Sequence, residues 1–341
     1  MISLCGAALA AGIWYWLVRP LIALALLVVV SLIAIILSLR FGPLLAGLGL
    51  SGAYIAPFLT GAPDGSALPL LPYAAVITAA GFALIRLKDW AFLAILTLCG
   101  AGLWGLIGVG IHGSASEWAA PVYAIVIGML GLVFGATHAR QAITLPDSWN
   151  GIVTTARGFP LMLAATYAFW ALAGGLILLK GFEDGGVYRV VSALAAYGGI
   201  GLFASWQRPG YSFITPLSAI VTVSALLVWT RIAPGLAYAC FAAAIGYGVA
   251  GTAVMSQMRF KAPLAGTAAL VAPAVIFIAV WRHNALEPNF YWALGTLLAA
   301  CVMGSVLDAM QRTDRGFKLH PGAAAAYALG AVLCAVLAPF L

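Results

Sequence analysis

Histidine and carboxylate side chains are the residues of this sequence that could bind a divalent metal ion or transfer protons near neutral pH. A candidate set stands in short polar connections between apolar segments: Asp64, His112, Glu117, His283 and Glu287. On the topology derived below, this set faces the outside of the cell and could serve a membrane-embedded enzyme. Its members come from separate loops and match no ligand motif such as HExxH, so solvated loop residues are the simpler interpretation and no resident metal is expected.

Other motifs that carry chemistry are missing from the sequence. It has no GxSxG, no Walker A loop and no paired acidic motif in a long loop, and His138 and His320 join no cluster. The cysteines lie inside apolar segments without CxxC spacing, which is typical of small buried hydrophobic residues: Cys5, Cys99, Cys240, Cys301 and Cys334. The sequence therefore predicts no cofactor, leaves any catalytic residue unknown and favours a protein that is not an enzyme.

Composition places the chain in a lipid bilayer. Hydrophobic residues make up 64% and charged residues only 7%, and the mean hydropathy is +1.09; soluble domains carry roughly 25% charged residues. No ionisable residue sits clearly at the centre of an apolar run, where it would be a functional candidate. Asp308 and Arg231 come closest and are interpreted as interface groups. Transport coupled to ions through a midplane carboxylate is therefore disfavoured.

The apolar runs predict membrane-spanning helices, since each approaches the roughly 20 residues that a span requires. They cover residues 1–18, 20–39, 41–60, 67–85, 90–110, 119–137, 159–179, 190–206, 213–230, 233–254, 264–281, 289–307 and 322–341. Strands are excluded because the runs are continuous rather than alternating. The first run lacks a basic start and a cleavage pattern, so it is interpreted as a retained span rather than a signal peptide.

The predicted fold class is an all-α, polytopic integral membrane helical bundle of about 12–13 transmembrane helices, with no soluble domain. Residues 1–341 are expected to form a single transmembrane domain, and halves 1–137 and 159–341 joined by an inner interfacial loop, 138–158, are the alternative. Within that loop, Trp149, Ile152 and Val153 fall at helical spacing. This spacing predicts a short helix lying in the membrane interface, with plain coil as the alternative.

Basic residues predict the orientation. Connections that follow even-numbered spans hold eleven of the 16 Lys and Arg residues, and those that follow odd-numbered spans hold five. The even connections should therefore be cytoplasmic, which puts the N-terminus inside and the C-terminus outside. The +7 net charge follows from this bias, and no basic cluster indicates nucleic-acid binding.

Small residues predict where helices approach one another closely, because such contacts hold helices together in lipid. Candidate packing residues at spacings of four are Gly47 with Ser51, Gly49 with Ala53, Gly52 with Ala56, and Gly131 with Gly135. Looser groups recur at 198–201 and 246–251. Pro57 allows two further interpretations: it ends the helix, or it breaks the helix and frees carbonyl groups to line a cavity.

One region also carries a family resemblance. The segments LSLRFGPLLAGLGLSGAYIAPFLTG and LLPYAAVITAAGFALIRLKDWAFLAILTLCGAGLWGL resemble the bacterial predicted membrane proteins of "domain of unknown function 2339". The matching positions are Gly52, Tyr54, Pro57, Tyr73, Arg86, Trp90, Trp104 and Gly105. The resemblance is specific over about residues 35–110 and compositional elsewhere. It implies a bacterial inner-membrane protein without an assigned activity. Longer members carry additional N-terminal spans that this chain lacks, which indicates a short paralogue, a split gene product or a fragment.

Three functional classes remain open. A small-molecule or lipid-related permease needs a polar-lined path, for which the hydroxyl side chains available within spans are Ser51, Tyr54, Thr78, Tyr167, Ser205, Ser218, Thr222, Ser224, Thr267 and Ser305. A structural or assembly protein of the cell envelope needs only rigid helices with surfaces for other membrane subunits or for a missing N-terminal portion. A membrane-embedded enzyme comes third. Permease is favoured by analogy with transporters, and the lipid bilayer is the expected partner in every case.

Overall fold

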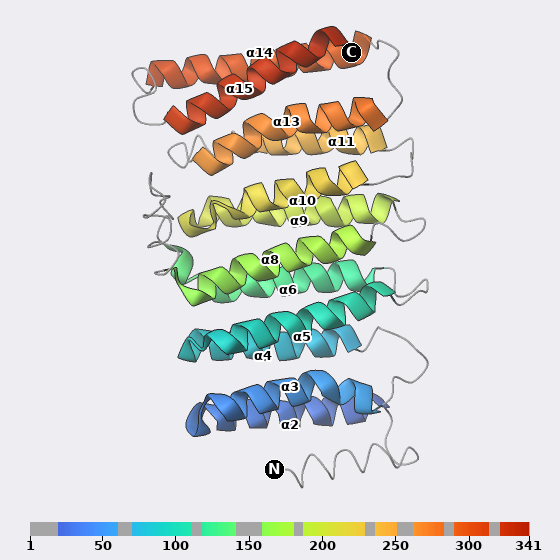
Figure 1. Cartoon of the computed structure of the whole chain (residues 1–341), viewed down its shortest axis with the longest axis vertical. Coiled ribbons are helices and arrows are strands. Elements are labelled where there is room, and N and C mark those ends of the chain that lie inside the picture. Colours follow the sequence, from blue (N-terminus) through green and yellow to red (C-terminus); the bar gives the residue numbers. More distant parts are fainter. Residues whose placement is uncertain are drawn as a thin grey trace. The chain divides into compact units, whose positions relative to one another are not determined.

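A computed structural model describes residues 20–60, 70–110, 118–140, 159–180, 187–228, 236–250, 262–282, 290–313 and 321–340. These residues are almost entirely helical and include no strand, which confirms the all-α fold class. The α-helices (Figure 1) are α2 (Pro20–Phe41), α3 (Pro43–Thr60), α4 (Leu70–Lys88), α5 (Ala91–Gly110), α6 (Ala119–Gly135), α8 (Leu161–Lys180), α9 (Val187–Gln207), α10 (Ile214–Val228), α11 (Leu236–Ile245), α13 (Ala262–Arg282), α14 (Phe290–Thr313) and α15 (Pro321–Leu337). A π-helical turn, η4 (Gly246–Ala250), extends α11, and short 3-10 turns are η2 (His138–Arg140), η3 (Pro209–Tyr211) and η5 (Ala338–Phe340).

Each predicted span from 20–39 onward corresponds to a helix, and most helix ends differ from the predicted ones by a few residues. The predicted span 1–18 and the predicted interfacial helix lie outside the described residues. Helix α14 continues to Thr313, although the apolar run is predicted to end at 307. The extension carries Asp308 and Arg312, whose side chains form an exposed ion pair at 2.6 Å on the last turns of the helix.

The helices have the length and composition of membrane spans. In the described part of the chain, five are long and apolar enough to cross a bilayer: Leu70–Lys88, Ala91–Gly110, Leu161–Lys180, Pro209–Leu227 and Ala293–Arg312. Shorter apolar stretches are Val29–Phe41, Pro43–Pro57, Ala119–Gly135, Ala269–Ile278 and Gly322–Leu337. Basic residues occupy the last turn of several helices, including Arg40, Arg86 and Lys180. Charge therefore lies at helix ends, as the sequence predicts, and a cation there also complements the helix dipole.

The chain divides into two compact units. Unit 1 comprises Met1–His138 and Leu145–Lys180, and its described part consists of the helical hairpins α2–α3, α4–α5 and α6–α8. The hairpins stack in order, because α4 contacts α2 and α6 while α5 contacts α3 and α8. Phe82 lies in the core of this stack, with its ring centroid 4.4 Å from that of Phe169.

Unit 2 comprises Ala139–Thr144 and Gly181–Leu341, with the hairpins α9–α10, α11–α13 and α14–α15. Helix α13 contacts α10 on one side and α15 on the other. The boundary falls after Lys180, whereas the alternative division expected from sequence assigned 159–179 to the second half. The difference has a packing cause: α8 lies against α6, where the hydroxyl of Thr166 donates to the carbonyl of Gly131 at 2.9 Å.

Candidate functional site

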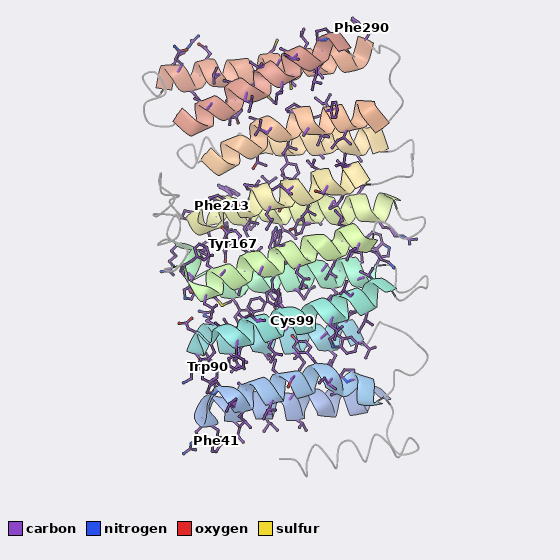
Figure 2. The ribbon with its side chains drawn as sticks, in the orientation of Figure 1. Phe41, Trp90, Cys99, Tyr167, Phe213 and Phe290 are labelled. Atoms are coloured by element: carbon purple, nitrogen blue, oxygen red, sulfur yellow. The ribbon has the colours of Figure 1, made fainter. Side chains whose placement is uncertain are left out.

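The candidate acid-base or metal residues cannot be placed. Asp64, His112, Glu117, His283 and Glu287 lie outside the described residues. The enzyme hypothesis therefore stays a prediction. On the described helices, nearly all of the side-chain atoms drawn are carbon (Figure 2).

The intramembrane hydroxyl groups do not converge on one cavity in the described part of the chain. Five of the ten candidates donate to a carbonyl one turn back in their own helix: Ser51 to Leu48 (3.2 Å), Thr78 to Ala74 (2.7 Å), Ser218 to Ile214 (2.9 Å), Thr222 to Ser218 (2.9 Å) and Ser305 to Val302 (2.7 Å). Such bonds satisfy a hydroxyl group without water or a ligand. The protons of these five hydroxyls are thus bonded to the protein's own backbone, which argues against a hydrophilic path for a solute.

In unit 1, polar groups gather in a buried network that we call the tyrosine cluster, made of Tyr54, Tyr73, Thr78, Trp104 and Tyr123. The Tyr54 hydroxyl lies 2.9 Å from Oγ1 of Thr78. Because Thr78 gives its own proton to a backbone carbonyl, Tyr54 is the donor in this pair. Trp104 Nε1 donates to the carbonyl of Tyr54 at 3.1 Å, and the Tyr123 hydroxyl donates to a carbonyl of α5 at 3.0 Å.

The tyrosine cluster also explains Pro57. Helix α3 continues through Pro57 to Thr60, so Pro57 neither ends the helix nor opens a cavity. Proline has no N–H, and therefore the carbonyl of Ala53, four residues earlier, loses its helical donor. The Tyr73 hydroxyl from α4 replaces that donor at 2.7 Å. The cavity interpretation of Pro57 is wrong over the described residues, because the freed carbonyl is bonded to a neighbouring helix.

The glycines of α3 have different surroundings from one another. A Cβ atom at Gly47 would lie 3.0 Å from the ring of Phe92, and one at Gly49 would lie 3.4 Å from Cβ of Ala34. Gly52 is exposed, and a Cβ atom there would meet no described atom within 4 Å. The expectation that Gly52 mediates close packing is therefore not met.

The buried positions of α3 are larger residues: Ala46, Leu50, Ala53, Tyr54, Ala56 and Pro57. Other glycines of unit 1 also lie against a neighbouring helix, and Gly100 is closer to its neighbour than the glycines of α3 are. A Cβ atom at Gly100 would collide with the ring of Tyr54, and one at Gly131 would lie 3.4 Å from Cα of Thr166. Gly135 is buried at the end of α6.

Unit 2 contains an apolar pocket, which we call the α9–α10–α11 pocket, with a volume of about 260 Å³. Its lining is Val191, Leu194, Ala195, Gly198, Gly199 and Leu202 from α9, Thr222 and Leu226 from α10, Ala239, Ala242 and Ala243 from α11, and Gly246 and Tyr247 from η4. More than half of these are Gly or Ala. The pocket exists because small residues occupy the places where larger side chains would fill the space between the helices.

One polar pair lies in the pocket wall. The Tyr247 hydroxyl is 3.2 Å from Oγ1 of Thr222, and both residues are buried. The same hydroxyl reaches the backbone of α9, since a Cβ atom at Gly198 would lie 2.5 Å from it. Tyr247 projects from the π-helical turn η4, and π-helical turns occur frequently at functional sites. The pocket can therefore hold an apolar group beside a fixed pair of hydroxyls.

Sequence reasoning did not identify this pocket. The glycine groups at 198–201 and 246–251 were its signal, but they were interpreted as packing glycines. The structure separates their roles: Gly198 and Gly201 lie against Tyr247 and Ser218, whereas Gly199 and Gly246 have open space beside them. Sequence spacing does not show on which side of a helix a neighbour is missing.

Comparison with known proteins identifies the family and leaves the activity open. The family model described as "Predicted membrane protein (DUF2339)" matches residues 1–340. No curated protein and no solved structure matches the chain. The match extends well beyond residues 35–110. The resemblance is specific only over that region because the later spans contain few distinctive residues other than small and apolar ones. The chain therefore belongs to the DUF2339 family of predicted membrane proteins.

Proposed function

We propose that this protein is a multi-pass protein of the bacterial inner membrane with a lipid-related, permease-like role. The observation that carries the proposal is the α9–α10–α11 pocket, an apolar hollow within helices that have the composition of membrane spans. A lipid-related ligand fits this lining better than a hydrophilic solute does, since the Thr222 hydroxyl is bonded to the carbonyl of Ser218 and the Tyr247 hydroxyl is paired with Thr222.

The role that we propose does not use ion coupling through a midplane carboxylate. Over the described residues, Asp89 lies between α4 and α5, and Asp308 lies in the last turns of α14 beside Arg312. Neither position is near the middle of a helix. A carboxylate at a helix end remains hydrated and does not carry protons across the hydrocarbon region.

The proposed orientation has the N-terminus in the cytoplasm and the C-terminus outside. Its support is the eleven-to-five bias of basic residues between the two sets of connections. Reporter fusions after residues 64 and 114 should report an outside location, and fusions after residues 88 and 148 an inside location. The reverse pattern would contradict the orientation and would move Asp64 and His112 to the cytoplasmic side.

The permease-like role is tested by reconstitution. Purified protein is placed in vesicles that contain a phospholipid with a nitrobenzoxadiazole label, and dithionite is added to bleach the label in the outer leaflet. We expect the protected inner-leaflet signal to decay faster than in protein-free vesicles. Folded, inserted protein that leaves this decay unchanged would contradict a lipid-moving role.

A structural or assembly role is the second candidate, and the tyrosine cluster favours it. The hydroxyl and indole groups of the cluster form hydrogen bonds that link α3, α4, α5 and α6. A scaffold needs such rigidity and needs no ligand. It would show no lipid movement in the vesicle assay and would co-purify with other membrane subunits.

A further inference from the structure

We infer that the α9–α10–α11 pocket binds one hydrocarbon chain of a membrane lipid, with the lipid headgroup remaining outside the pocket. The inference deepens the proposed lipid-related function by naming the ligand class and its site. It rests on the shape, the lining and the hydrogen bonds of the pocket.

The mouth of the pocket opens where the surface is apolar. Ala195, Gly199, Ala242 and Gly246 line the pocket and are also exposed. They belong to helices without a charged residue along this stretch, so the mouth faces hydrocarbon when the helices cross a bilayer. A lipid chain can therefore enter laterally without leaving the membrane.

The hydrogen bonds in the wall argue against a ligand group that needs a hydroxyl donor. Thr222 donates its only proton to the carbonyl of Ser218 at 2.9 Å. In the 3.2 Å contact between Thr222 and Tyr247, the donor must then be Tyr247. Neither hydroxyl has a proton left for a ligand. A hydrocarbon chain would leave both groups satisfied, whereas a buried headgroup would find no hydroxyl donor in this pair.

The size of the pocket favours a single chain. An apolar cavity of about 150 Å³ is enough to bind benzene, and sites for drug-sized ligands begin near 300 Å³. At about 260 Å³, the pocket falls between these two values. Within a bilayer the favourable binding free energy comes from packing rather than from the hydrophobic effect. A hydrocarbon chain between the three helices makes van der Waals contacts that the pocket lining lacks when the pocket is empty.

The test uses a phosphatidylcholine with a diazirine in the middle of one acyl chain, incorporated into nanodiscs that hold the whole protein. After irradiation, labelled peptides are quantified by mass spectrometry. We expect the label to concentrate on the α9 and α11 segments that line the pocket, above its density on the largely exposed helix α14. Gly199→Leu fills the pocket, since a Cβ atom there meets no described atom within 4 Å.

Gly304→Leu is the matched control, because Gly304 lies in unit 2, outside the pocket, and also has open space beside it. We expect Gly199→Leu to lower pocket labelling about tenfold or more, as obstruction of an apolar pocket does, and Gly304→Leu to leave it unchanged. Ala242→Leu repeats the test from α11 if Gly199→Leu does not fold.

Equal labelling of the pocket in Gly199→Leu and Gly304→Leu would overturn the inference, as would equal label density on the pocket and on α14. Movement of labelled lipid in the vesicle assay without pocket labelling would also overturn it while leaving the proposed function standing. Pocket labelling that is lost in Gly199→Leu, without lipid movement, would uphold the inference and contradict the permease-like role.

Discussion

The contact between Tyr73 and the backbone of α3 gives a quantitative prediction. Tyr73 is only 4% exposed, and its hydroxyl donates to the carbonyl of Ala53 at 2.7 Å. Pro57 removes the helical donor of that carbonyl, so Tyr73→Phe would leave a buried carbonyl without its proton donor. An unsatisfied buried group costs about 1–3 kcal/mol, whereas interhelical hydrogen bonds in membranes average about 0.6 kcal/mol. We expect Tyr73→Phe to lower the free energy of unfolding by about 1–2 kcal/mol.

A double-mutant cycle isolates the role of Pro57. Pro57→Ala restores an N–H that can donate to the carbonyl of Ala53. On that background Tyr73→Phe should cost only about 0.6 kcal/mol, which leaves a coupling energy near 1 kcal/mol. The free energy of unfolding is measured by titrating folded protein in mild detergent with a denaturing detergent and following its circular dichroism.

Tyr123→Phe is the control for this cycle. Tyr123 is 3% exposed and donates to the carbonyl of Ala101 at 3.0 Å, in a helix without proline. That carbonyl retains its helical donor, so the cost of Tyr123→Phe should be the same on both backgrounds. An equal cost of Tyr73→Phe with and without Pro57 would refute the reasoning, as would coupling between Tyr123 and Pro57.

Two further predictions concern unit 1. Gly100→Ala should destabilise the protein by about 1–3 kcal/mol, because its Cβ atom would collide with the ring of Tyr54. Gly52→Leu should express and melt like the parent, since the space beside Gly52 is open. Thermal melting in mild detergent compares the two variants, and a lower melting temperature of Gly52→Leu would contradict the open surroundings of Gly52. Lys180→Met should cost about 0.3–1 kcal/mol, since the Lys180 ammonium donates to the carbonyl of Val109 at 3.0 Å near the C-terminal end of α5; Lys180→Arg should retain most of that stability in the same assay.

The sequence predicts the helices well and their faces poorly. A span is determined by its own composition, so the positions of α4, α5 and α8 follow closely from the apolar runs. The side of a span that contacts a neighbour depends on the other helices. A glycine can face lipid as well as a helix interface. A Cβ atom at Gly49 would lie 3.4 Å from Cβ of Ala34 in α2, whereas one at Gly52, three residues later, would meet no described atom within 4 Å.

The same limit applies to the sites. Pro57 and Tyr73 stand out in the sequence, but their link through the carbonyl of Ala53 requires two helices to be positioned. The α9–α10–α11 pocket exists because no large side chain fills the space between three helices. The π-helical turn that carries Tyr247 has no signature in an Ala- and Gly-rich sequence.

The central claim is that the α9–α10–α11 pocket serves a lipid-related function. Its most direct test compares the rate of leaflet exchange of labelled phospholipid in vesicles that contain the parent, Gly199→Leu or Gly304→Leu at equal amounts of folded protein. We expect the parent and Gly304→Leu to accelerate exchange, and exchange with Gly199→Leu to be about tenfold slower than with the parent. Exchange at the parent rate with Gly199→Leu, or at the protein-free rate with all three proteins, would contradict the central claim.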